Sequence, residues 1–78
     1  MTVFRVEVTD EVTGFFLSER LRRGAAVEVS DDDAWEVRVD ADGQAGEVLD
    51  ELRAWLLDEG LSSARVYLDG KLFTLSVE

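Results

Sequence analysis

Two short acidic segments contain the residues that could bind a metal ion. Residues 31–33 are three consecutive aspartates, and carboxylate oxygens are the ligands that Ca²⁺ and Mg²⁺ prefer. Consecutive residues of a tight turn point in different directions, however, and no neighbouring Asn or bidentate Glu completes a coordination shell. Residues 40–43 contain the Asp and Gly of a calcium-binding loop, but the loop would need carboxylates where Arg38 and Leu49 stand. The sequence therefore predicts no metal site and indicates solvated turns.

The sequence also lacks most of the side chains that catalysis requires. Residues 43–46, Gly-Gln-Ala-Gly, have no Lys and no Ser or Thr to complete a phosphate-binding loop. The chain has no His and no Cys, and no serine has a base in its vicinity. We expect every carboxylate to lie on an exposed face or in a turn, where burial would not raise its pKa for acid or base chemistry. We therefore expect a protein that is not an enzyme, has no catalytic residues and binds no cofactor.

The negative charge of the chain is concentrated in its middle. Residues 25–62 hold twelve of the eighteen acidic residues but only two of the eight basic residues, so this segment accounts for the whole formal net charge of −10. The two flanking segments are neutral. A chain with this charge should repel nucleic acid and attract a basic protein surface. The expected partner is therefore a basic protein, with no direct nucleic-acid binding and no membrane binding.

The composition also bears on the cellular setting. No apolar run approaches the roughly 18 residues of a membrane span, and the N-terminal residues lack the pattern of a signal peptide. Without cysteine no disulfide can form, so we expect a cytoplasmic protein. Seven arginines stand against one lysine among many carboxylates, which is also typical of proteins from halophiles. In that alternative, the acidity would serve only solvation in a housekeeping domain of unknown role.

The elements that must position the acidic residues follow from hydrophobic periodicity. Alternating apolar and polar residues predict five strands, over residues 3–8, 25–29, 34–40, 64–68 and 72–77. The turn at residues 30–33 predicts one hairpin, and Asp69-Gly70 predicts a second hairpin with a type I′ turn. In that hairpin, Tyr67 and Leu72 are expected to lie together on the outer face of the sheet.

Two segments are predicted to be helical. Residues 44–59 carry apolar side chains at the spacing of an amphipathic helix, at Ala45, Val48, Leu49, Leu52, Trp55 and Leu56. Residues 10–23 indicate a short helix whose core stripe would contain Phe16, Leu17, Arg20 and Leu21. Gly14 and the pair Phe15-Phe16 would also permit a strand over residues 15–18. Both tryptophans, Trp35 and Trp55, are expected on core faces.

The element order predicts one α+β domain over residues 1–78. A mainly antiparallel sheet of four to five strands, with two helices on one face and the order βαββαββ, is a ferredoxin-like arrangement. The alternative is a β-grasp-like fold over residues 25–78, in which residues 65–72 resemble ubiquitin-like proteins. The last residues, Ser76-Val77-Glu78, include no Gly-Gly tail, so conjugation is not implied.

In the ferredoxin-like order, the charged residues at the ends of the strands and helices are expected to lie in two groups, one at each end of the sheet. One end of the sheet should collect seven carboxylates, at Asp10, Glu11, Asp31, Asp32, Asp33, Asp58 and Glu59. The other end, roughly 20 Å away at ~3.3 Å per strand residue, should collect Asp40, Asp42, Glu47 and Asp69 together with Arg20, Arg22, Arg23 and Lys71. The seven carboxylates are the predicted partner-binding residues.

These predictions support one leading hypothesis of function and leave an alternative. The leading hypothesis is a small acidic non-enzymatic binding module that docks a basic protein surface, in its sharpest form an inhibitor or immunity-type protein that mimics the charge of nucleic acid. The alternative is a ferredoxin-like regulatory domain that binds a small molecule as a dimer. That dimer would use the outer sheet face, with Arg5, Glu7, Arg38, Arg65 and Tyr67. A monomer and a homodimer both remain open.

Overall fold

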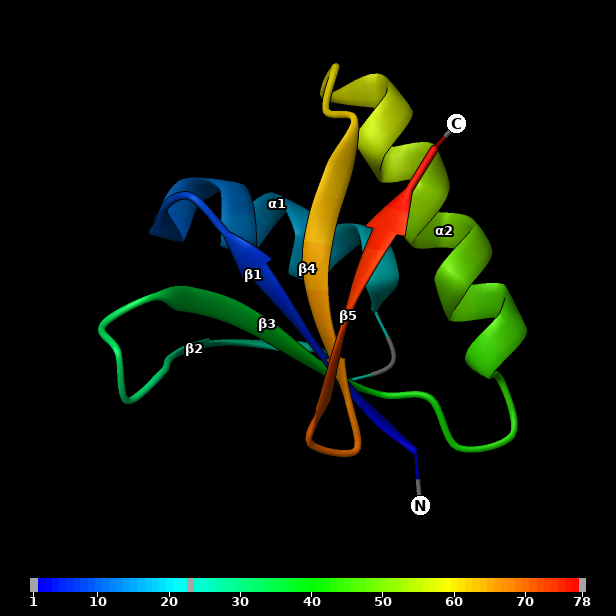
Figure 1. The fold of residues 1–78 in the computed structure, drawn as a ribbon, viewed down its shortest axis with the longest axis horizontal. Helices are drawn as coiled ribbons and strands as arrows, with labels where there is room; N and C mark the ends of the chain where they lie inside the picture. The colour runs from blue at the N-terminus through cyan, green and yellow to red at the C-terminus, as the bar shows by residue number, and fades with distance from the viewer. Residues whose placement is uncertain (1, 23, 78) are drawn as a thin grey trace.

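A five-stranded antiparallel sheet forms the centre of the computed structural model, which describes residues 2–22 and 24–77. The elements in chain order are β1 (Val3–Val8), α1 (Glu11–Leu21), β2 (Ala26–Val29), β3 (Trp35–Asp40), α2 (Ala45–Asp58), β4 (Ser63–Leu68) and β5 (Lys71–Ser76) (Figure 1). All neighbouring strands are antiparallel, and the strand order is β2-β3-β1-β4-β5. The predicted ferredoxin-like α+β fold is confirmed, with β5 as an additional edge strand.

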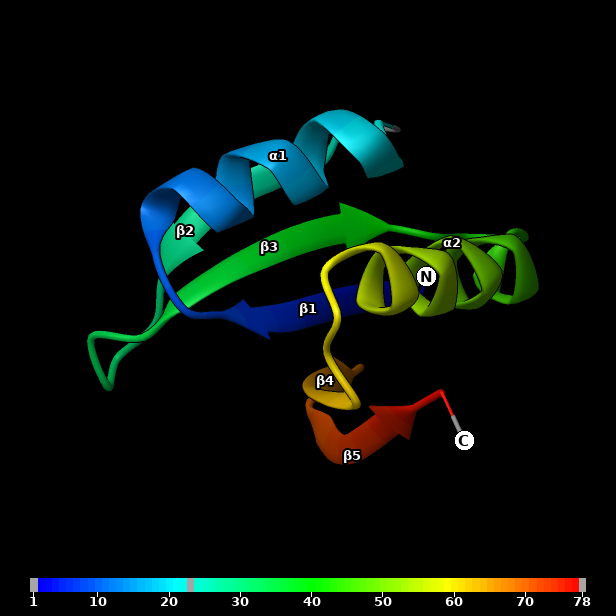
Figure 2. The same cartoon turned by 90° about the horizontal axis from the view of Figure 1, so that it is seen from above.

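The register of the sheet puts the predicted apolar residues on one face. On the central strand β1, Val6 lies opposite Val37 of β3 and Val66 of β4, and Phe4 lies opposite Val39. Both helices lie on this face of the strongly twisted sheet, and α1 covers β2 and β3 (Figure 2). The helices contribute Leu17, Leu21, Val48, Leu52, Trp55 and Leu56 to the core between the two layers. The twist makes α1 and α2 cross at a steep angle (Figure 1).

The second hairpin has the turn that its sequence predicts. Asp69 and Gly70 both adopt positive φ, of 50° and 86°, as a type I′ turn requires. The side chain of Asp69 also accepts a hydrogen bond from the backbone N–H of Val3, with a distance of 3.0 Å. Tyr67 and Leu72 lie opposite each other across the hairpin, as predicted.

Residues 11–21 are helical, which decides between the two interpretations of this segment. Asp10 caps the helix: its Oδ1 accepts a hydrogen bond of 2.7 Å from the backbone N–H of Thr13. Hydrogen bonds from the first turn stabilise the ionised form and hold the pKa of the Asp10 carboxyl below its usual value of 3.8.

The cap makes a prediction about the pH dependence of stability. A lowered pKa in the folded state means that ionised Asp10 stabilises the fold above pH 3.8, and that this contribution is lost as the pH falls through the folded-state value. We expect Asp10→Ala to lower the urea midpoint of unfolding at neutral pH, because the Thr13 N–H loses its acceptor. Asp10→Asn should retain most of the stability, because asparagine is also a good N-cap.

Urea unfolding of the three proteins across the acidic range provides the measurement. The difference between the original chain and Asp10→Ala should shrink on acidification. A difference that stays constant from neutral to strongly acidic pH would show that the charge of Asp10 is not involved.

Candidate functional site

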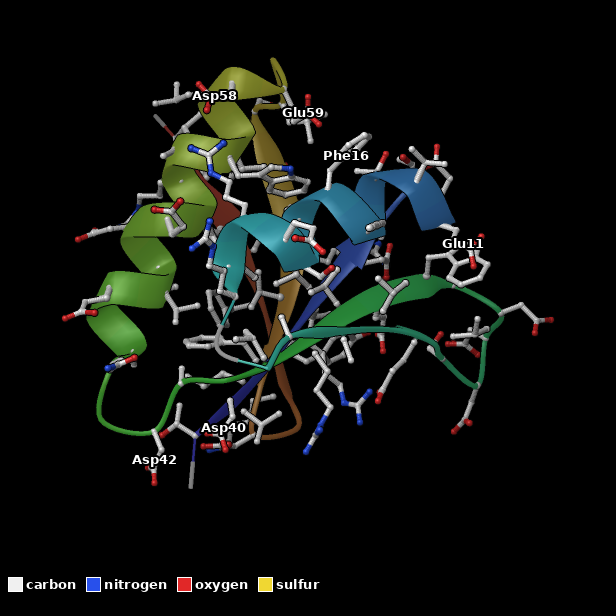
Figure 3. The ribbon with its side chains drawn as sticks, turned by 180° about the vertical axis from the view of Figure 1, so that it is seen from behind. Glu11, Phe16, Asp40, Asp42, Asp58 and Glu59 are labelled. Atoms are coloured by element: carbon white, nitrogen blue, oxygen red, sulfur yellow. The ribbon has the colours of Figure 1, made fainter. Side chains whose placement is uncertain are left out.

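Strand pairing places the seven predicted partner-binding carboxylates at one end of the sheet. Strand β1 ends at Val8, which lies opposite Trp35 at the start of β3. The segment that begins with Asp10 and Glu11 therefore leaves the sheet beside the turn between β2 and β3. Helix α2 ends at Asp58 and returns through Glu59 to β4, which enters the sheet at this same end. Asp40 and Asp42 lie at the opposite end (Figure 3).

The twist of the sheet divides these seven carboxylates into two groups. The turn between β2 and β3 projects to one side of the molecule, whereas the end of α2 lies at another corner (Figure 1). The carboxylates of the turn and of the start of α1 form the first group, which we call the hairpin acids: Asp10, Glu11, Asp31, Asp32 and Asp33. Asp58 and Glu59 form the second group.

Arg20 neutralises part of the second group, which corrects the expectation that it lies with Asp40 and Asp42. Its Nη1 lies 2.6 Å from Oδ2 of Asp58, and its Nε lies 3.1 Å from Oε1 of Glu51. These ion pairs raise the pKa of the Arg20 guanidinium. Arg20 lies in the last turn of α1, and because α1 crosses α2 its side chain reaches Glu51 and Asp58 of α2 instead of the far end of the sheet. Arg23 was also expected to lie with Asp40 and Asp42, but it is not among the described residues.

Among the hairpin acids Asp10 caps α1, whereas the three aspartates of the turn extend into solvent. Asp31, Asp32 and Asp33 are exposed, and Asp33 has a φ of 61°, which aspartate tolerates better than most residues. Asp31 and Asp32 line a hollow on the outer face of the hairpin, which we call the acidic hollow. Its walls are Arg5, Glu28, Val29, Ser30, Asp31, Asp32, Glu36 and Tyr67. Among the described residues, four carboxylates and a single guanidinium line it.

Glu36 is buried, which the sequence did not indicate. Only 6% of the residue is exposed, so the expectation that every carboxylate lies on an exposed face or in a turn is wrong. Glu36 lies opposite both Glu7 and Glu28, so three carboxylates form a row across β1, β3 and β2. The Nη1 of Arg5 lies 2.9 Å from Oε1 of Glu28 and 3.5 Å from Oε1 of Glu36. Arg5 thus reduces the repulsion that like charges in register would otherwise cause.

Helix α1 exposes large apolar side chains beside the hairpin acids. Val12, Phe15 and Phe16 are 62%, 47% and 66% exposed, and the two rings stack with centroids 6.2 Å apart. The predicted core stripe is therefore wrong for Phe16, although it is right for Leu17 and Leu21, which are buried. In the view of Figure 3, Phe16 projects from α1 between the positions of Glu59 and Glu11.

Gly14 explains which side of α1 faces the sheet. A Cβ atom at this position would lie 3.2 Å from Cγ1 of Val27 and 3.2 Å from Cγ2 of Val8. The helix therefore packs tightly against the sheet at Gly14, and the residues that share its face, Leu17 and Leu21, enter the core. The spacing of Gly14, Leu17 and Leu21 was the signal in the sequence that could have placed Phe16 outside.

An apolar groove runs between α1 and the edge strand β2. Glu11, Val12, Phe15, Phe16 and Val27 line it, and we call it the α1–β2 groove. An exposed cluster of aromatic and β-branched side chains is typical of an interaction site, whereas single exposed apolar residues are common on any protein. The groove and the hairpin acids together form the candidate binding site.

The described parts of the chain give no indication of a metal centre or a membrane span. Residues 2–22 and 24–77 contain no group of three or more acidic side chains arranged to hold a metal ion. None of the helices in these residues is long and apolar enough to cross a membrane.

No protein-family model matches the chain, and no curated protein or solved structure matches it.

Proposed function

We propose that this protein is a small non-enzymatic binding module that docks a basic protein surface through the acidic end of its sheet. The observation that carries the proposal is the exposure of Phe15 and Phe16 beside the hairpin acids. Protein interfaces commonly combine a few aromatic anchors, which supply most of the binding energy, with charged residues at the rim. The candidate site offers both.

The two parts of the site should have different roles in binding. The net charge of −10 and the three consecutive aspartates at 31–33 would attract a basic surface over a distance, which raises the rate of association. The aromatic side chains act only at contact and would slow dissociation. The acidity therefore supplies steering and selectivity, while the groove supplies affinity.

In its sharpest form, the proposal is an inhibitor or immunity-type protein. Carboxylates presented on the β2-β3 hairpin would occupy a basic groove that otherwise binds the phosphates of nucleic acid. The turn between β2 and β3 suits this role because it projects from the sheet with three exposed aspartates (Figure 1). The protein itself would not bind nucleic acid, since its own charge repels phosphate.

Removal of the three negative charges at residues 31–33 tests whether they attract a basic partner over a distance. We expect the triple variant Asp31→Asn, Asp32→Asn, Asp33→Asn to associate about tenfold more slowly at low salt with a basic partner, because its long-range attraction is reduced. The difference should vanish at high salt, where exposed charges are screened. Stopped-flow association with a partner captured from native cells at low salt and released at high salt gives the rates.

A matched control removes the same number of charges elsewhere. The triple variant Asp40→Asn, Asp42→Asn, Asp50→Asn has the same net charge as the first triple variant but retains the hairpin acids. It should associate at nearly the original rate. If both triple variants slow association equally, only the net charge matters and the proposed site is wrong.

A further inference from the structure

Strand β2 has one edge that no other strand uses. It is the first strand in the order β2-β3-β1-β4-β5, and within the described residues only β3 pairs with it. The backbone N–H of Ser30 donates to the carbonyl of Ala34 over 2.8 Å, which makes Ser30 and Ala34 a hydrogen-bonded pair. Such pairs alternate along an antiparallel ladder. The pair of Glu28 and Glu36 is therefore also hydrogen-bonded, and Val27 and Val29 direct their N–H and C=O groups away from β3.

The two sides of this edge differ in chemical character. On the side of the helices, the α1–β2 groove presents Phe15, Phe16 and Val27. On the outer side, the acidic hollow presents carboxylates, among them Glu28 and Asp31. Side chains of a strand point alternately to the two faces of its sheet. A strand added to β2 would thus direct every second side chain into the groove and the others toward the carboxylates.

We propose that the edge of β2 binds an extended basic segment of the partner protein, in which apolar residues alternate with lysine or arginine. This inference rests on the proposed function, since it assumes that the partner is basic. Main-chain hydrogen bonds to Val27 and Val29 would hold the segment, as in other cases of strand addition to a sheet edge. Its apolar side chains fill the α1–β2 groove, and its cations face the acidic hollow.

Charge favours this occupant over a second copy of the chain. Pairing of two β2 edges would bring together two acidic hollows and two sets of hairpin acids, each copy carrying a net charge of −10. The other sheet edge, β5, offers no equivalent: Lys71 begins it, and neither the groove nor the hollow includes a β5 residue. A basic segment therefore has its charge and its apolar contacts matched only at β2 among the described edges.

Short synthetic peptides test the inference on the full chain. The first peptide has blocked ends and about six residues that alternate valine and lysine, and the second has the same composition with valines and lysines in two separate blocks. We expect the alternating peptide to bind at least about tenfold more tightly. Its binding should protect the amides of Val27 and Val29 from hydrogen exchange in NMR spectra, without protecting the amides of β5. An alternating valine–glutamate peptide should not bind.

The outcomes separate this inference from the proposed function. Equal binding of the two lysine peptides, or binding without protection of Val27 and Val29, would overturn strand addition while the acidic docking site still stands. If neither lysine peptide nor any basic protein binds at any salt concentration, the proposed function fails as well. Two further alternating valine–lysine peptides, N-methylated at every second residue in the two possible registers, check the main-chain bonds: one register should abolish binding and the other should retain it.

Discussion

Truncation of Phe15 and Phe16 to alanine should weaken binding of a basic partner by at least about 30-fold and leave the fold intact. Aromatic anchors at interfaces commonly contribute 2 kcal/mol or more, which corresponds to about this factor. Because Phe16 is 66% exposed and Phe15 is 47% exposed, the free energy of unfolding should change by less than about 1 kcal/mol. Isothermal titration calorimetry and urea unfolding measure the two quantities on the same samples.

Leu57 provides a matched control for this prediction. It has the same exposed fraction as Phe16, 66%, but lies on α2 and not in the α1–β2 groove. Leu57→Ala should leave both binding and stability nearly unchanged. If Leu57→Ala weakens binding as much as the double phenylalanine variant, exposed apolar area in general is responsible and not the groove.

The residue next to Phe16 should behave in the opposite way. Leu17 is fully buried between α1 and the sheet, so Leu17→Ala removes packing contacts and leaves a cavity. Substitutions of this kind cost about 2 to 5 kcal/mol, which is a large part of the total stability of a domain of this size. We expect the midpoint of chemical unfolding to fall steeply, while binding per folded molecule is retained.

Circular dichroism in guanidinium chloride, with binding measured under conditions where the variant is folded, separates the two effects. A loss of less than about 1 kcal/mol would mean that Leu17 does not pack as the structure shows. If truncation of Phe16 weakens binding and truncation of Leu17 lowers stability, one face of α1 packs on the core and another face contacts a partner.

Much of the fold follows from local patterns in the sequence. The stripe of Val48, Leu52 and Leu56 predicts α2, and these three side chains are fully buried. The Asp69-Gly70 turn and strand alternation fix the second hairpin and its register. Element order then restricts the topology, since each helix must connect strands that lie two positions apart in the sheet.

The site is less predictable because it depends on tertiary geometry. Helix α1 is apolar on several sides, so periodicity alone does not show which side faces the core; the close approach at Gly14 decides it. The partners of Arg20 depend on the angle at which the helices cross, which the twist of the sheet sets. Glu36 is buried because Glu28 of the same hairpin and Arg5 and Glu7 of β1 lie around it, and the two β1 residues are distant from Glu36 in sequence.

The most direct measurement is an NMR titration of the whole chain with the alternating valine–lysine peptide, which shows where a basic ligand binds. We predict that the amide chemical-shift changes are concentrated in α1, β2 and the turn at residues 30–34, and that added salt reduces them. Changes centred on Asp40 and Asp42 at the opposite end of the sheet, or spread evenly over all exposed carboxylates, would contradict the proposed docking site.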